Sequence, residues 1–111
     1  MEELDIEYGR PTVDVAMPLL TERLRSLKKS GVKAVKIIHG YGSTGKGGRL
    51  RKATLTLLDE LKTSGLIKEF VIGERWSKFA PRTLTLIDRM PQLYKDQDLE
   101  RHNRGITIVF L

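Results

Sequence analysis

The chain has 111 residues and carries 20 lysines and arginines against 14 aspartates and glutamates, which gives a formal net charge of +6. This length suits one domain, residues 1–111, with a modest core. Cysteine is absent, which excludes disulfides and cysteine-ligated metal sites. We expect a cytoplasmic protein, because no segment is apolar enough to span a membrane and the acidic start does not resemble a signal peptide.

The first strand is predicted at ELDIE, residues 3–7, where polar and apolar side chains alternate. Period-2 geometry would place Leu4 and Ile6 on one side of this strand and Asp5 and Glu7 on the other.

A helix is predicted after the turn at YGRP. Thr12 could cap this helix through its hydroxyl, and apolar residues then recur every three or four positions to about residue 29. Pro18 lies beyond the first turn, so we expect either a kink or a later helix start. Ser30 and Gly31 are a typical helix end.

Three further strands are predicted, at KAVKIIH (33–39), LIKEFVI (66–72) and GITIVFL (105–111). The last is apolar on both faces, which favours a central position. A second helix is expected from Gly48 or Arg49 to Ser64. Right-handed crossovers would place both helices on one face of a four-stranded mixed sheet. The predicted fold class is therefore α/β, a two-layer sandwich of β-α-β-α-β-β order.

Residues 73–104 form an insertion before the last strand that is too long for a plain loop. Trp76 and Phe79 are expected to anchor it to the body of the domain. Short helices are predicted at 82–90 and at 91–102, the second with a proline at its first turn.

Basic residues dominate the interval between Glu22 and Asp59, which contains no acidic residue. Like charges without local partners repel one another unless a polyanion or solvent screens them, and nucleic acid is the usual polyanion for a small basic protein. The alternative is a solvated basic face. The cations in this interval are Arg23, Arg25, Lys28, Lys29, Lys33, Lys36, Lys46, Arg49, Arg51 and Lys52.

The glycine-rich loop at 40–48 partly matches the P-loop pattern of nucleotide-binding proteins. Gly40, Gly45 and Lys46 fit, but Gly47 stands where a magnesium-binding hydroxyl is needed. TLTLID, residues 83–88, imitates the apolar run that accompanies a P-loop, but it has helix-like neighbours and four strands are too few for that fold. The sequence therefore disfavours an NTPase.

A phosphate cradle remains the favoured interpretation of this loop, with a flexible loop that holds no ligand as the alternative. Glycines let backbone N–H groups turn inward, and the following helix start contributes free N–H groups and positive charge. The predicted nucleic-acid-binding residues are Gly40, Tyr41, Gly42, Lys46, Gly47, Arg49, Arg51 and Lys52. Tyr41 could stack on a base or on His39, which is a candidate for proton transfer.

HGYG, residues 39–42, follows an apolar strand and precedes a basic helix, and in this setting it resembles the HGxG motif of the Smr (small MutS-related) domain family. LDI at 4–6 resembles the start of that family's LDxH motif, TVDVA at 12–16 looks like its first-helix start, and GITIVFL looks like its closing strand. The resemblance covers residues 3–72 and 105–111.

The resemblance implies the sandwich of the C-terminal domain of bacterial translation initiation factor three. It also implies binding of DNA or RNA, and in some members nicking of DNA or cleavage of mRNA, in recombination control or ribosome rescue. Carried over position by position, it selects Leu4, Asp5, His39, Gly40 and Gly42.

The sequence departs from the family pattern in its first motif, because Glu7 stands where LDxH would have its histidine. The catalytic set is then Asp5, Glu7 and His39. The two carboxylates could act as a base or hold a divalent metal, the one cofactor this set could use. Alternatively Glu7 is an exposed residue that repels phosphate, which is the interpretation we favour. The glycine loop is also longer than in typical members.

The sequence thus predicts a standalone Smr-like protein that binds nucleic acid. If it is an enzyme, we expect it to nick DNA or cleave RNA, and the ribosome is a further candidate partner. The alternative is a non-catalytic interaction module, a monomer or weak dimer, that docks through the insertion on a protein or on the ribosome. Its apolar contact residues would be Trp76, Phe79, Leu84, Leu86 and Tyr94.

Overall fold

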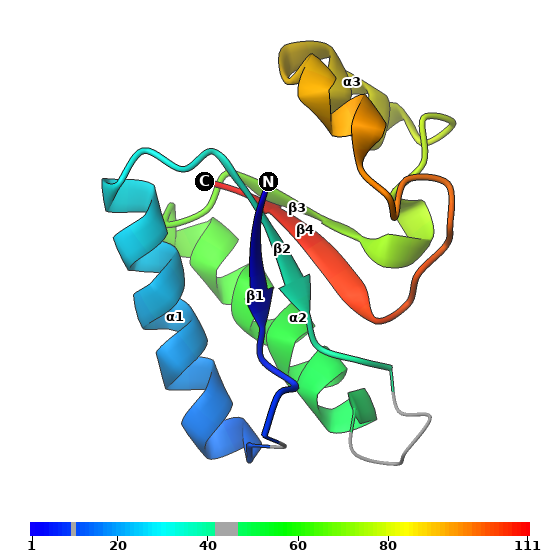
Figure 1. Ribbon diagram of the computed structural model, residues 1–111. Helices are drawn as coiled ribbons and strands as arrows, with labels where there is room; N and C mark the ends of the chain where they lie inside the picture. Colours follow the sequence, from blue (N-terminus) through cyan, green and yellow to red (C-terminus); the bar gives the residue numbers. More distant parts are fainter. Residues whose placement is uncertain (10, 42–46) are drawn as a thin grey trace.

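The structure is a computed structural model that describes residues 1–9, 11–41 and 47–111. Four strands and three α-helices follow the predicted order, with two short 3-10 helices in the insertion (Figure 1). The strands are β1 (Glu2–Asp5), β2 (Ala34–Ile38), β3 (Glu69–Ile72) and β4 (Ile106–Phe110). The helical segments are α1 (Val13–Lys29), α2 (Gly47–Ser64), η1 (Gly73–Arg75), α3 (Pro81–Arg89) and η2 (Pro91–Lys95).

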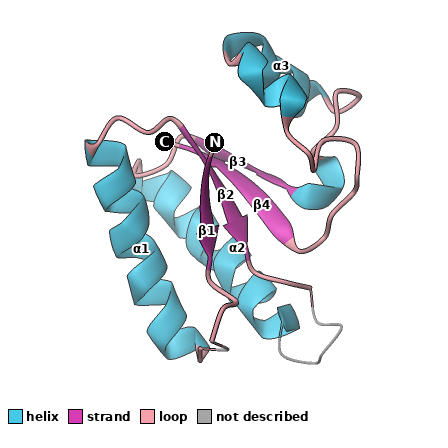
Figure 2. Ribbon diagram, in the orientation of Figure 1, coloured by secondary structure: helices cyan, strands magenta, loops and turns pink. Residues whose placement is uncertain are grey.

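The sheet is mixed and has the strand order β1-β2-β4-β3. β1 runs parallel to β2, and β4 is antiparallel to both of its neighbours (Figure 2). β4 is therefore central, as its apolar sequence predicted. Its residues alternate between the two faces, so Val109 and Ile108 are both fully buried although they belong to different cores.

One face of the sheet is covered by α1 and α2, which lie side by side along it (Figure 1). The apolar stripes of both helices pack on β2 here, with Leu20, Leu24 and Leu58 buried against Val35 and Ile37. Burying one such side chain contributes about 1.5–3 kcal/mol relative to leaving it exposed. This layer confirms the predicted α/β sandwich with two helices on one face.

Two details of α1 differ from the prediction. Thr12 is the N-cap residue, but its side chain makes no capping hydrogen bond. The helix begins at Val13 despite Pro18, so the later start is wrong. Pro18 lacks the N–H that would bond to the carbonyl of Asp14, and its exposed position leaves that carbonyl open to water.

The insertion folds over the other face of the sheet. Trp76, Ile87 and Leu93 are buried there in a second apolar cluster, against Ile108 and Phe110 of the central strand. This segment therefore adds a third layer over the face that a two-layer description leaves open. Trp76 anchors it as expected, and the centroids of the Trp76 and Phe110 rings are 6.4 Å apart. Phe79 does not, because 82% of its surface is exposed.

The insertion is less helical than its sequence pattern predicted. The helix at 82–90 is confirmed as α3, but the one at 91–102 shrinks to η2 and is followed by turns. The physical reason is that Asp96 and Asp98 turn inward to meet the buried ammonium of Lys36. Asp96 also accepts a hydrogen bond from the backbone N–H of Asp98, which competes with a continuing helix.

TLTLID lies inside α3, not on a strand, which agrees with the exclusion of a P-loop fold. In the part of the chain that the structure describes, no helix is both long and apolar enough to cross a membrane.

Candidate nucleic-acid interface

The candidate site lies where β2 ends, next to the start of β4. The carbonyl of Gly105 accepts hydrogen bonds from the backbone N–H groups of both His39 and Gly40, at 2.9 and 3.1 Å. Gly40 has a φ of +74°, and a Cβ added there would lie 1.9 Å from Oε2 of Glu7. The positive φ favours glycine at position 40, and the Glu7 carboxylate lies directly against it, so a larger residue would also have to displace that side chain.

His39 is fully buried, and both of its ring nitrogens are engaged. Nδ1 lies 2.7 Å from the carbonyl oxygen of Gly40, and Nε2 lies 2.8 Å from the hydroxyl of Thr107. Because a carbonyl can only accept, Nδ1 carries the proton, and the Thr107 hydroxyl donates to Nε2. Burial lowers the pKa of His39, with a further contribution from the nearby Arg51, so the ring is held neutral. The side chain thereby ties the end of β2 to β4.

The two carboxylates predicted beside His39 are arranged differently from the prediction. β1 ends at Asp5, whose carboxylate accepts hydrogen bonds from the backbone N–H groups of Glu7 and Tyr8, at 3.0 and 3.1 Å. This turn takes Glu7 off the strand, so the alternation that would place it on the side of Asp5 does not apply. Glu7 instead lies on Gly40, which brings together the LDxH-like and HGxG-like segments. Asp5 is exposed and organises the turn.

Tyr41 is half-exposed and has a cationic neighbour from the other end of the chain. The guanidinium carbon of Arg104 lies 5.9 Å from the centroid of the Tyr41 ring, within range of a cation–π contact. Gly105, directly before β4, lies beside this ring, since a Cβ added there would lie 3.4 Å from Cδ1 of Tyr41, an ordinary van der Waals distance. Arg104 was not predicted from the sequence, because it lies 63 positions from Tyr41. The one local feature that could have pointed to it is a basic residue directly before the glycine that precedes the last strand.

The start of α2 contributes the remaining cations. Arg49 and Lys52 are exposed, and the first turn of the helix contains no acidic residue. Arg51 is different: its guanidinium lies 2.8 Å from the carboxylate of Glu74, and its side chain is only 24% exposed. Gly47 begins the helix. The predicted contacts at Gly42 and Lys46 lie outside the described residues.

The basic interval also has more partners than its sequence indicated. Lys36 is fully buried and pairs with Asp96 and Asp98, and the ammonium of Lys28 donates to two backbone carbonyls that follow α2. The interval has no acid of its own, as its sequence shows, but Lys28, Lys36 and Arg51 have partners elsewhere in the protein, and Arg25 lies 3.7 Å from Glu22 at the border of the interval. The acids that compensate two of them come from the insertion, far away in sequence. In the described ranges, no three histidine, aspartate or glutamate side chains gather to hold a metal ion.

Comparison with known proteins gives two findings. The sequence profile of the Smr domain matches residues 9–78, which include α1, β2, the glycine-rich loop, α2 and β3. The fold is similar to that of the Smr domain of Thermus thermophilus MutS2 in its crystal structure, with a TM-score of 0.61 and 21% sequence identity over 100% of this chain and 98% of the other. No sequence among curated proteins matches the chain. The profile spans well over half of the 111 residues and includes the HGYG segment, so the chain belongs to the Smr domain family.

Proposed function

We propose that this Smr domain binds nucleic acid at the end of β2 and grips the phosphate backbone between the glycine-rich loop and the start of α2. The observation that carries the proposal is the exposed ring of Tyr41 beside Arg104, at the same end of the sheet as the exposed cations of α2. An aromatic platform flanked by guanidinium and ammonium groups suits bases and phosphates together.

The phosphate contacts come from α2. Its first N–H groups have no partner within the helix, and Arg49 and Lys52 project from its first turns without an acidic neighbour in the first turn. Gly40, Gly42, Lys46 and Gly47 complete the proposed cradle on the strength of the sequence pattern. Arg51 takes a supporting role here, because its guanidinium is held by Glu74.

Single-stranded nucleic acid fits this surface best. Tyr41 can stack on a base only if that base is unpaired or at a strand end, and such stacking contributes about 1–3 kcal/mol per base. Arg104 would hold the neighbouring phosphate or the second face of the base. The proposal covers RNA and DNA alike, because these contacts use features common to both.

Binding is better supported than cleavage by the geometry of His39. A proton donor or acceptor must reach the reacting phosphoryl group, and this ring is buried with both nitrogens occupied. A cleavage step through His39 would first have to open its bond to Thr107 or to Gly40. We therefore assign His39 a positioning role, in which it fixes the peptide that begins the glycine-rich loop. Asp5 shapes the turn that follows β1, and Glu7 from that turn lies against Gly40.

The test is fluorescence anisotropy with labelled single-stranded RNA, single-stranded DNA and duplex DNA at several salt concentrations. Arg49→Ala combined with Lys52→Ala should weaken binding and lower the salt slope by about 1.4, since each lost phosphate contact on a single strand removes roughly 0.7. Arg23→Ala combined with Arg25→Ala is the matched control, because it removes the same charge from the exposed side of α1. Equal affinities of both double variants would remove the loop from the interface.

A second arm isolates stacking and catalysis. Tyr41→Phe should bind like the parent and Tyr41→Ala more weakly, since only the first keeps an aromatic ring. Incubation of the same strands with magnesium, manganese or a chelator reports cleavage directly. Cleavage that disappears in His39→Ala, with binding retained, would convert the positioning role into a catalytic one.

Docking on a protein partner is the second candidate function. It is favoured by three large apolar side chains that the insertion exposes, Phe79, Leu84 and Tyr94. Trp76 is unavailable for it, since none of its surface is accessible. Size-exclusion chromatography of nuclease-treated protein at several concentrations tests it, and a concentration-dependent dimer that binds no nucleic acid would favour docking over the first proposal.

A further inference from the structure

A second basic surface lies at the opposite end of the sheet from Tyr41. It is a cleft of about 510 Å³ between α3 and the edge where β2 begins and β4 ends. Its cations are Lys33, Lys68, Arg82 and Arg89, and its apolar floor includes Phe110 and Leu86. The volume is in the range of sites that hold a small organic group.

The charge in this cleft is almost entirely positive. Lys33, Lys68 and Arg89 are exposed, and none of them has an ion-pair partner among the described residues. The one acidic lining residue, Glu69, is already neutralised, with its carboxylate 2.9 Å from the ammonium of Lys62 and 3.5 Å from Arg82. The cleft therefore presents an excess of cations that the protein itself does not compensate.

The insertion creates this cleft by placing one face of α3 across from the sheet. Arg82, Leu86 and Arg89 are spaced by four and three residues, so they share a side of the helix, and all three line the cleft. Without α3 the cations of the sheet edge would lie on an open surface. The basic cleft is thus a property of residues 73–104, a segment that the proposed loop contact does not use.

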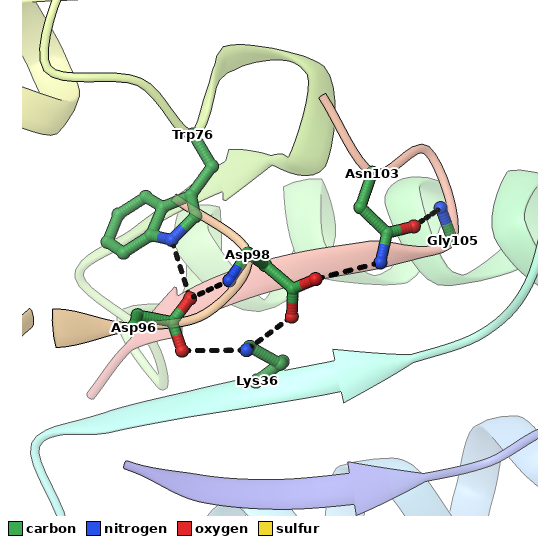
Figure 3. Close-up of polar contacts among 6 residues, drawn as sticks. All are labelled: Lys36, Trp76, Asp96, Asp98, Asn103 and Gly105. Atoms are coloured by element: carbon green, nitrogen blue, oxygen red, sulfur yellow. Dashed lines mark hydrogen bonds and ion pairs between the residues drawn. The ribbon is translucent and has the colours of Figure 1, made fainter. Parts of the chain in front are cut away.

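A buried polar network fixes the insertion in this position. The ammonium of Lys36 lies 2.7 Å from Asp96 and 2.5 Å from Asp98, the indole N–H of Trp76 donates to Asp96 at 2.9 Å, and Asn103 donates to Asp98 at 3.0 Å (Figure 3). Charged groups at these depths are held in defined positions by their partners. The segments on both sides of α3 are therefore held in place by groups of the protein itself, which favours a cleft of defined shape over an incidental surface groove.

We propose that this cleft is a second contact for the same nucleic-acid strand, with phosphates held by its lysines and arginines and a base resting on the floor at Leu86 and Phe110. The proposal rests on the nucleic-acid-binding function assigned above and extends it to the insertion. Lys33 and Gly40 are joined by the extended chain of β2 at about 3.3 Å per residue, so roughly 23 Å separates the two surfaces. At about 3.4 Å per stacked nucleotide, a strand needs on the order of seven nucleotides to reach both.

The test compares a labelled 20-nucleotide strand with a 4-nucleotide strand of the same composition. Lys33→Ala combined with Arg89→Ala should lower the salt slope for the long strand by about 1.4. Both side chains are exposed, so the fold should be retained, which circular dichroism verifies. Thr85→Glu, which adds an acidic group to the cleft lining and removes no cation, should weaken long-strand binding in the same direction. Arg23→Ala with Arg25→Ala again serves as the control of equal charge.

The outcomes separate this inference from the proposed function. Weaker binding of the long strand by the cleft variants supports the cleft contact. If Arg49→Ala with Lys52→Ala leaves binding unchanged in the same experiment, that result rejects only the loop contact. Silent cleft variants beside an effective loop variant would overturn the cleft and leave the proposed function standing. Saturation of the cleft by a free mononucleotide that does not compete with the long strand would also overturn it, because the ligand would then be a nucleotide and not a strand.

Discussion

The two faces of the sheet are covered by layers of different chemistry. The layer of α1 and α2 packs on the sheet through an apolar cluster that includes Leu24 and Leu58, and Thr54 of α2 is an uncharged polar residue buried in the same helix. The insertion layer combines an apolar cluster around Trp76 with the buried group formed by Lys36, Asp96 and Asp98. The first layer contains no buried ion pair among the described residues, whereas the second needs particular charged partners in particular positions.

This difference has an energetic meaning. Apolar packing stabilises almost any arrangement of similar volume, so it sets the stability of the helix layer more than its exact register. A buried ion pair contributes little net stability against an apolar replacement, but it is costly to leave half-formed. The network around Lys36 therefore selects one placement of the insertion, and with it the shape of the basic cleft.

The largest effect is expected from breaking that network on one side. Lys36→Ala leaves Asp96 and Asp98 together with no cation, at side-chain exposures of only 11% and 16%. Removing one partner of a buried ion pair typically costs about 3–5 kcal/mol. Urea unfolding followed by circular dichroism should show this loss, and hydrogen exchange should show it concentrated in residues 73–104.

Two comparisons sharpen that prediction. Lys36→Met combined with Asp96→Asn and Asp98→Asn removes the charges together and should recover part of the lost stability. Its affinity for long strands should nevertheless stay reduced if the network positions α3. A Lys36→Ala protein as stable as the parent would show that the insertion layer, like the helix layer, does not depend on charged partners for its stability.

The contrast between the layers also explains what the sequence could predict. The order of strands and helices, the central place of β4 and the helix at 82–90 all follow from local apolar periodicity, which needs no knowledge of distant residues. The pairing of Lys36 with Asp98 spans 62 positions, and nothing near Lys36 signals it. The same holds for Arg104 beside Tyr41. For the candidate site, the glycine-rich loop and the start of α2 could be proposed from one continuous stretch of sequence, whereas the contacts that Arg104 and Glu74 make with it from the insertion could not.

A smaller but still large effect is expected in the helix layer. Leu58→Ala removes a fully buried side chain from the apolar cluster, and such truncations cost about 2–5 kcal/mol, so about 3 is expected here. The loss should appear as global unfolding, with the exchange of all four strands accelerated equally. Thr56→Ala on the exposed side of the same helix is the control and should stay within about 0.5 kcal/mol. Exchange confined to one layer would contradict the idea that this cluster holds the whole domain.

The next effect is a difference in pH dependence: the two layers should lose stability over different pH ranges, because different groups titrate in them. Burial lowers the pKa of His39, so its contribution to stability is complete above a pH of about 6.5 and is lost as the pH falls toward the folded-state pKa. Burial alone would raise the pKa of Asp98, but hydrogen bonds from Lys36 and Asn103 outweigh it and leave the pKa lowered. The insertion layer therefore keeps its contribution until the pH falls below about 4.

The measurement is the free energy of unfolding between pH 3 and pH 8, with a slope of at most about 1.4 kcal/mol per pH unit for each group. His39→Gln should flatten the decline that begins below about pH 6.5, and Asp98→Asn should flatten the decline below about pH 4. In alkali, burial alone would lower the pKa of Lys36, but its two aspartate partners raise it, so the ion pair persists up to the pH where the folded-state lysine loses its proton. Identical acid profiles for the parent and His39→Gln would remove the buried histidine from this account.

The smallest effect is expected where the two layers touch at the end of the sheet. Arg51 of α2 reaches Glu74 of η1 at 2.8 Å, and both side chains are partly exposed, at 24% and 32%. Exposed or half-exposed pairs contribute about 0–1 kcal/mol, so Arg51→Ala should cost less than about 1 kcal/mol. Arg49→Ala, two residues away and with no ion-pair partner among the described residues, should cost nothing measurable in stability and should weaken nucleic-acid binding more than Arg51→Ala does. If Arg51→Ala weakens binding as much as Arg49→Ala while stability is unchanged, Arg51 contacts the strand directly, and the supporting role assigned to it through Glu74 is wrong.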